Sequence, residues 1–167
     1  MYKLLQYNVV VFIWFYFTSN CMNIKKYHSN KSQCPIAHAL DIMWDKWTLL
    51  VLRDIVLMNK HEFNEFLSMK EKIATNILTD RLKKLWEFGM IDSIPYPNNK
   101  KKKLYHLTDK WIDIIPMIVE MIAWSGRNLP DVYQWEELEF FKHQSQNAKD
   151  MLIKQAQEWN KNNLIDK

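Results

Sequence analysis

Residues 73–108, IATNILTDRLKKLWEFGMIDSIPYPNNKKKKLYHLT, decide the fold of this chain. Their first half has helical periodicity, because Leu78, Leu82 and Leu85 recur on one face of a helical wheel. The opposite face is polar and carries Asn76, Thr79, Asp80 and Lys83. Gly89 is predicted to end this helix in the left-handed conformation that glycine adopts readily.

The second half of the stretch predicts a small β-hairpin. The segment MIDSIPYP (90–97) is a strand candidate, and LYHLT (104–108) is the candidate for the returning strand. The proline and asparagine residues between them favour a turn. On this reading four consecutive lysines form a long basic tip of the hairpin: Lys100, Lys101, Lys102 and Lys103.

Helical patterns lie upstream of this stretch. A first helix begins at Cys34 and has Pro35 in its first turn, where proline is well tolerated. Asp45 is expected to cap a second helix, KWTLLVLRDIVLM (46–58), whose continuous apolar run predicts burial on most sides. A short third helix is expected around residues 64–69.

Two further helices are predicted downstream. Thr108 or Asp109 can cap the helix DKWIDIIPMIVEMIAW (109–124), and Pro116 should kink it or lie at a bend. A last amphipathic helix begins near Trp135. Its ragged apolar stripe is typical of a core or a dimer seam and consists of Leu138, Phe141, Ala148, Leu152, Ala156 and Trp159.

The order of these elements indicates the fold class. It is mainly α with a small β-hairpin, a winged helix-turn-helix with additional C-terminal dimerisation helices. In that fold the helix before the hairpin enters the major groove of DNA, and the hairpin tip lies along the phosphate backbone. The element order therefore predicts double-stranded DNA as a partner.

Charge and composition agree with this class. Residues 22–110 carry 16 Lys and Arg against 10 Asp and Glu, whereas residues 111–167 carry 6 against 9, so the basic part suits a polyanion. The chain has no zinc-ligand spacing, no phosphate-binding glycine loop and no Ser/His/Asp signature, so neither enzyme activity nor a cofactor or metal is expected. Two cysteines, Cys21 and Cys34, are too few for a disulfide framework and favour the cytoplasm.

Six short motifs, each weak alone, occur together in the same chain. They are Cys-Pro at 34–35, Lys-Trp-Thr-Leu-Leu at 46–50, Phe-Asn-Glu at 63–65, Leu-Thr-x-Arg-Leu at 78–82, Gly89, and Tyr-x-Leu-Thr at 105–108. With this set the chain closely resembles the HxlR family of bacterial winged-helix regulators, which are relatives of the MarR repressors. The resemblance covers about Cys34 to Trp124, over half of the chain.

The resemblance implies a sequence-specific transcriptional regulator, a homodimeric repressor in which each subunit reads half of an inverted repeat. Dimerisation in such proteins uses the first helix and the helices after the wing, which here are residues 34–44, 109–124 and 135–160. The expected domains are an apolar extension (1–24), the winged-helix DNA-binding domain (25–126) and a C-terminal helical extension (127–167).

The chain departs from the family pattern at four positions. Trp44 and Trp111 stand where glycine is usual. Ala74 replaces a common serine at the start of the recognition helix, so Thr75 is expected to cap that helix instead. Asp80 replaces a frequent amide, and a carboxylate repels phosphate and could accept only from cytosine N4. The family's base preference is therefore not carried over.

The candidate DNA-binding residues lie on the recognition helix and on the lysine tip. Asn76 and Thr79 are the best candidates for base readout, and Lys83 for a phosphate contact. The lysine tip should attract phosphates regardless of sequence. The full set is Thr75, Asn76, Thr79, Asp80, Arg81, Lys83, Lys100, Lys101, Lys102 and Lys103.

Cys34 is the candidate for regulation. It lies at the start of the first helix, where the helix dipole favours a thiolate, and His38 is one turn further on the same face. In several members of the family that the chain resembles, the cysteine at this Cys-Pro position senses oxidants or electrophiles. A redox switch through Cys34 is therefore one reading, and a simple packing cysteine is the other.

Residues 4–17, LLQYNVVVFIWFYF, are the most apolar stretch. They are fewer than the roughly 18–20 residues that a membrane-spanning helix needs, and no signal-peptidase site follows them. Three readings remain: a membrane anchor, a buried extension, or an upstream start codon with Met22 as the true initiator. The last two are favoured, and the first defines an alternative function, a membrane-tethered helical interaction protein.

Overall fold

The computed structural model describes residues 34–43, 45–96, 99–129 and 138–164. The chain forms two compact units, Met1–Trp44 and Asp45–Lys167. The described part of the first unit is Cys34 and helix α2 (Pro35–Met43), which begins one residue after the predicted start and has Pro35 in its first turn as predicted. The apolar stretch 4–17 and its three readings lie outside the described residues. Within the described residues, no helix is both long and apolar enough to cross a bilayer.

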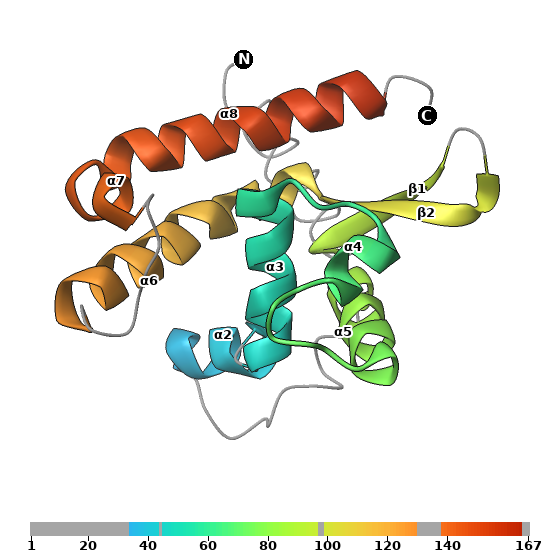
Figure 1. The fold of residues 1–167 in the computed structure, drawn as a ribbon, viewed down its shortest axis with the longest axis horizontal. Helices are drawn as coiled ribbons and strands as arrows, with labels where there is room; N and C mark the ends of the chain where they lie inside the picture. The colour runs from blue at the N-terminus through green and yellow to red at the C-terminus, as the bar shows by residue number, and fades with distance from the viewer. Residues whose placement is uncertain (1–33, 44, 97–98, 130–137, 165–167) are drawn as a thin grey trace, which may run out of the picture. The chain divides into compact units, whose positions relative to one another are not determined.

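Helix α3 (Lys46–Met58) is the centre of the second unit (Figure 1). Asp45 caps it as predicted, since its Oδ1 accepts hydrogen bonds from the backbone N–H groups of Trp47 (3.1 Å) and Thr48 (3.0 Å). The helix ends at Asn59 in the left-handed conformation. Its apolar run is buried at Val51 and Leu52, as the sequence indicates.

Helix α4 (Phe63–Leu67) and helix α5 (Thr75–Glu87) follow. The leucine face of α5 is buried as predicted, and Gly89 ends the helix with a φ of 63°. The Gly89 N–H bonds to the Trp86 carbonyl and the Met90 N–H to the Leu85 carbonyl, the double closure of a Schellman motif. The prediction that Thr75 caps α5 is wrong.

The N-cap of α5 is Ala74, which has no side-chain capping bond, and Thr75 is already the first helical residue. A residue inside the helix has helical backbone angles and cannot turn its side chain back onto the first N–H groups. The Thr75 carbonyl instead accepts a hydrogen bond from the Thr79 hydroxyl at 2.8 Å. The N-terminus of α5 therefore presents its N–H groups without a side-chain cap.

Strands β1 (Ile91–Tyr96) and β2 (Asn99–Leu107) pair antiparallel into the predicted hairpin. The lysines do not form its tip, which corrects the expectation: Lys100–Lys103 belong to β2. The pairing passes from Pro95↔Lys103 directly to Tyr96↔Asn99, so the register skips three lysines. Pro95 has no N–H to give to a ladder, which favours an irregularity at this point.

The helix predicted over 109–124 is divided in two. A 3₁₀ helix, η2 (Asp109–Ile114), is followed by helix α6 (Ile115–Asn128), which has Pro116 in its first turn. Pro116 lacks an N–H and would clash with a preceding helical turn, so an α-helix starts there more readily than it passes through. Thr108 is the N-cap of η2, but its hydroxyl bonds to the Gly89 carbonyl at 2.7 Å.

The last predicted helix is also two helices, α7 (Leu138–His143) and α8 (Ser145–Asn163), because Gln144 leaves the helical region with φ −130° and ψ 40°. Phe141, Ala148 and Leu152 are buried, as the apolar stripe predicts. Helix α8 lies over α6, η2 and α3 and reaches β2 (Figure 1). The fold is thus mainly helical with one hairpin, the predicted winged helix-turn-helix.

Candidate nucleic-acid interface

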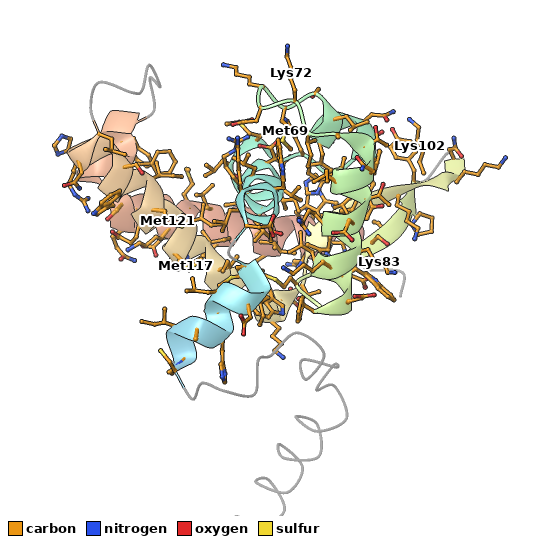
Figure 2. The ribbon with its side chains drawn as sticks, turned by 90° about the horizontal axis from the view of Figure 1, so that it is seen from below. Met69, Lys72, Lys83, Lys102, Met117 and Met121 are labelled. Atoms are coloured by element: carbon orange, nitrogen blue, oxygen red, sulfur yellow. The ribbon has the colours of Figure 1, made fainter. Side chains whose placement is uncertain are left out.

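The polar face of α5 is open to solvent. Of the residues predicted there, five are exposed: Thr75, Asn76, Thr79, Asp80 and Lys83. The Lys83 side chain is 71% exposed and its Nζ lies 3.9 Å from Glu87. The Lys83 and Lys102 side chains lie on the side of the molecule where α5 and the hairpin meet (Figure 2). This face can offer amide, hydroxyl and ammonium groups to a ligand.

Arg81 lies apart from this open face. Its Nε is 2.9 Å from Asp45 Oδ1, and its Nη1 donates to Asp80 Oδ2 at 2.7 Å. Lys84 adds a longer contact of 3.8 Å to Asp45. Burial alone would raise the pKa of the Asp45 carboxyl, but the Thr48 hydrogen bonds and the charges of Arg81 and Lys84 outweigh it and lower that pKa. Asp45 therefore joins the start of α3 to the middle of α5.

The lysines of β2 are exposed at Lys101, Lys102 and Lys103, while the side chain of Lys100 lies outside the described set. Lys102 is partly engaged within the chain. Its Nζ is 3.4 Å from Glu62 Oε2 and 5.6 Å from the centre of the Tyr96 ring. The hairpin thus presents a basic strand edge in which one ammonium is already oriented by an acid and an aromatic ring.

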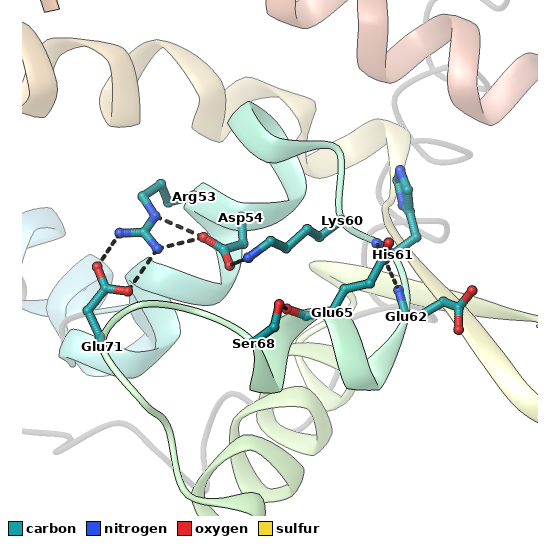
Figure 3. Close-up of polar contacts among 8 residues, drawn as sticks. All are labelled: Arg53, Asp54, Lys60, His61, Glu62, Glu65, Ser68 and Glu71. Carbon is teal, nitrogen blue, oxygen red and sulfur yellow. Dashed lines mark hydrogen bonds and ion pairs between the residues drawn. The ribbon is translucent and has the colours of Figure 1, made fainter. Parts of the chain in front are cut away.

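Sequence reasoning missed a charged network around Asp54 of α3 (Figure 3). The fully buried carboxylate of Asp54 accepts from Arg53 (2.6 and 2.9 Å) and from Lys60 (2.7 Å). Arg53 also donates to Glu71 (2.6 and 3.2 Å). The hydrogen bond from Arg53 lowers the pKa of the Glu71 carboxyl more than burial raises it. The network ties α3 to the turns before α4 and α5.

The turn into α4 is closed by Glu65. Its Oε2 accepts from the backbone N–H groups of His61 and Glu62, both at 2.8 Å. Glu62 and Glu65 form the reciprocal capping box of this short helix. An isolated bridge pairs Glu62 with Leu104 of β2. Helix α4 is therefore fixed to β2, and it also packs against α5.

The proposed regulatory pair lies in the first unit. Cys34 is exposed and directly precedes α2. The His38 N–H donates to the Cys34 carbonyl at 3.2 Å, so the two residues share one helical turn, as predicted. Elsewhere, among all residues that the structure describes, no three His, Cys, Asp or Glu side chains gather as metal ligands would.

Comparison with known proteins identifies the same fold and family. A family model described as HxlR-like helix-turn-helix matches residues 42–133. An uncharacterised HTH-type transcriptional regulator of Mycobacterium tuberculosis, MT3179, is 30% identical over 95 residues, which cover 57% of this chain. The match spans 59% of that protein, so this chain accounts for about three fifths of the length of such relatives.

Two solved structures are similar over the same region. The crystal structure of PA1607, a candidate transcription factor, has a TM-score of 0.52 and 30% identity, with 64% of this chain and 70% of that chain covered. The redox regulator HypR in its reduced form has a TM-score of 0.50 and 26% identity, with 60% of this chain and all of that chain covered. Helices α7 and α8 follow the region that the family model matches.

Proposed function

The chain belongs to the HxlR-like helix-turn-helix family of transcriptional regulators, and from this premise we propose that it is a sequence-specific DNA-binding repressor that acts as a homodimer in the cytoplasm. The observation that carries the proposal is the exposed polar face of α5 in a unit that also exposes the lysines of β2. Ion pairs from Arg53 to Glu71 and from Arg81 to Asp45 fix α5 and the turn before it to α3. This arrangement matches the way in which winged helices dock on DNA. Binding of that kind requires no catalytic residues.

The residues of α5 divide into two roles. Asn76 and Thr79 read base edges, since an amide and a hydroxyl can each pair with specific groups in the major groove. Lys83 contacts phosphate, and Thr75 adds a hydroxyl near the helix N-terminus, where N–H groups favour an anion. The Asp80 carboxylate repels phosphate and can accept a hydrogen bond from the N4 amino group of cytosine. We assign Arg81 a positioning role, because its guanidinium is already engaged by Asp45 and Asp80.

Dimerisation is proposed through residues 34–44, 109–124 and 135–160. Large apolar side chains are exposed on these segments, at Ile36 (69%), Trp124 (55%) and Met151 (50%). Exposed apolar groups of this size favour a protein contact. A two-fold dimer would place two copies of α5 on successive major grooves, which predicts an inverted-repeat operator.

Replacing Lys100–Lys103 together by alanine should weaken binding to every DNA sequence alike. Each phosphate contact that is lost should reduce the slope of log affinity against log salt by about 0.9. The measurement is a gel shift with the DNA upstream of the chain's own gene and with unrelated DNA, at several salt concentrations.

A matched pair of variants separates this effect from a general loss of charge. Lys101→Ala with Lys103→Ala removes two exposed lysines of β2, and Lys154→Ala with Lys161→Ala removes two exposed lysines of α8. Only the first pair should flatten the salt dependence. Equal slopes for the quadruple variant and the parent would contradict a role of the lysines in DNA binding.

A thiol switch at Cys34 is the second part of the proposal. It is supported by the exposure of Cys34 at the start of α2 and by the similarity to the redox regulator HypR. With diamide as oxidant, the Cys34 thiolate adds to one nitrogen of the N=N bond, and a second thiol then attacks the Cys34 sulfur, breaks the S–N bond and releases the hydrazine. The products are a disulfide and the reduced hydrazine. The second thiol comes from the partner subunit or from a small thiol.

Cys34→Ser should therefore abolish the release of DNA by diamide, while Cys21→Ser should leave it unchanged. The check is a gel shift before and after diamide, followed by reduction with dithiothreitol. Release of DNA from Cys34→Ser at the parent's diamide concentration would contradict the switch and leave the DNA-binding proposal standing.

A further inference from the structure

Helix α8 is attached through one aromatic side chain to the β1–β2 hairpin, which is the wing of this fold. The Trp159 ring is stacked with two imidazoles, with its centre 4.3 Å from that of His61 and 5.1 Å from that of His106. The ring planes are inclined by only 18° and 27°, so both contacts are stacked. His61 lies in the turn between α3 and α4, and His106 lies in β2. We call these three residues the Trp159 stack.

Polar contacts surround the stack and add to the attachment. The Asn160 amide donates to the Leu107 carbonyl (3.0 Å) and to Asp109 Oδ1 (2.7 Å), at the end of β2 and the start of η2. The Gln155 amide donates to Asn59 Oδ1 at 3.3 Å. One face of α8 therefore contacts both the hairpin and the α3–α4 turn, the two parts that position α4 and α5.

The imidazoles are enclosed, and one nitrogen lacks a partner. His106 is 3% exposed, and among the described residues its Nε2 has no hydrogen-bond partner. His61 Nδ1 is 2.8 Å from the Tyr105 carbonyl. The cavity beside the rings is about 20 Å³, which suits a single water molecule and no larger ligand. A proton is thus the effector that this site could sense.

Charged groups of both signs surround the stack. Glu65 of α4 faces His61, and Asp92 of β1 is the cross-strand partner of His106. Asp54 forms an ion pair with Lys60, and Glu158 of α8 forms one with Lys154. Asp109 accepts a hydrogen bond from the Asn160 amide. Glu62 pairs with Lys102, and Lys161 is exposed on α8. A charge on one ring would repel a charge on the other.

We propose that α8 is a proton-sensitive latch on the hairpin: the Trp159 stack holds the hairpin and the α3–α4 turn in the DNA-binding arrangement, and protonation of His61 releases the helix. The proposal rests on the proposed DNA-binding function for its effect on affinity. Because α8 lies beyond the region that the family model matches, the latch is a property of this chain's own C-terminal helix.

The direction of the pH effect follows from His61. Burial lowers the pKa of its imidazole, and the nearby His106 lowers it further. The hydrogen bond to the Tyr105 carbonyl and the charge of Glu65 raise that pKa, but the net pKa lies below the ordinary value of 6.5. A cation stacked on Trp159 gains some attraction, but burial outweighs it. The docked state therefore binds the proton less tightly than the released state. Docking is fully favoured above about pH 6.5 and weakens as the pH falls below that value.

The test combines histidine NMR with DNA binding between pH 7.5 and 5.0. At pH 7.5 the ring protons of His61 and His106 should be shifted upfield by Trp159, and these shifts should disappear as the pH falls. Trp159→Leu should lack the shifts at every pH. At pH 7.5 it should bind DNA about threefold to tenfold more weakly than the parent, the worth of one or two stacked pairs, and at pH 5.5 this gap should close.

Three further variants make the result decisive. His61→Gln with His106→Gln removes both stacked pairs, so it should bind DNA at pH 7.5 as weakly as Trp159→Leu and should lack the pH dependence. Trp159→Phe should be intermediate, and Glu158→Gln should behave as the parent. Upfield shifts that persist to pH 5.0 while His61 is protonated would overturn the latch. So would equal DNA affinities of the parent and Trp159→Leu at pH 7.5. If the parent binds no DNA at any pH, the proposed function fails, and the ring-proton shifts still decide whether the helix is released.

Discussion

Replacing Asp54 by asparagine should lower the free energy of unfolding by about 3–5 kcal/mol, which is a large part of the stability of a domain of this size. Asp54 is fully buried and receives three hydrogen bonds from Arg53 and Lys60. An amide of the same shape would leave two cations partly buried beside a neutral group. Urea unfolding followed by circular dichroism, at one fixed protein concentration, measures the loss.

The same substitution at Asp150 is the matched control, because Asp150 is exposed on α8 and its Oδ1 accepts a hydrogen bond from the amide of Gln146 at 3.0 Å. Asp150→Asn should change the free energy of unfolding by less than about 0.5 kcal/mol. The loss in Asp54→Asn should also persist at 1 M salt, since buried pairs are weakly screened. A stability equal to that of Asp150→Asn would mean that the network is not required for folding.

The parts of the fold that sequence predicted correctly depend on neighbours within one or two turns of the chain. Asp45 bonds to N–H groups two and three residues ahead, and Gly89 closes the helix that precedes it. The leucine face of α5 follows from a spacing of three and four residues, and all three leucines are buried. Such features need no knowledge of the rest of the molecule.

The wrong predictions came from competing local rules. A lysine run between turn residues indicates a loop, yet Lys100–Lys103 belong to β2, and the register shift beside Pro95 accommodates three of them within the strand. Pro116 can kink a helix or begin one, and here it begins α6. Thr75 was assigned as a cap because Ala74 cannot serve, and the structure leaves that position without a side-chain cap.

The network around Asp54 and the Trp159 stack could not be predicted from sequence. Arg53 and Glu71 are 18 residues apart, and Trp159 joins residues that precede it by 53 and 98 positions. No spacing rule relates such pairs. One signal was available: Asp54 interrupts the apolar run 46–58, and a carboxylate inside a buried helix must have partners. Recognising it would have predicted a network without naming its members.

Replacing Asn76 and Thr79 together by alanine should remove the choice of sequence and keep the general affinity for DNA. A good bidentate contact contributes about 1–3 kcal/mol of discrimination, so the double variant should lose about tenfold to a thousandfold in operator binding. Binding to unrelated DNA should hardly change, because phosphate contacts supply it. The quantity to measure is the ratio of the two affinities at one salt concentration.

Lys83→Ala gives the contrasting control on the same exposed face of α5. It should weaken binding to the operator and to unrelated DNA by the same factor, reduce the salt slope by about 0.9, and leave their ratio unchanged. If Asn76→Ala with Thr79→Ala lowers both affinities equally, as Lys83→Ala should, then α5 touches only the backbone. Specificity would in that case have to come from the shape and deformability of the DNA, read through the hairpin and the spacing of the two subunits.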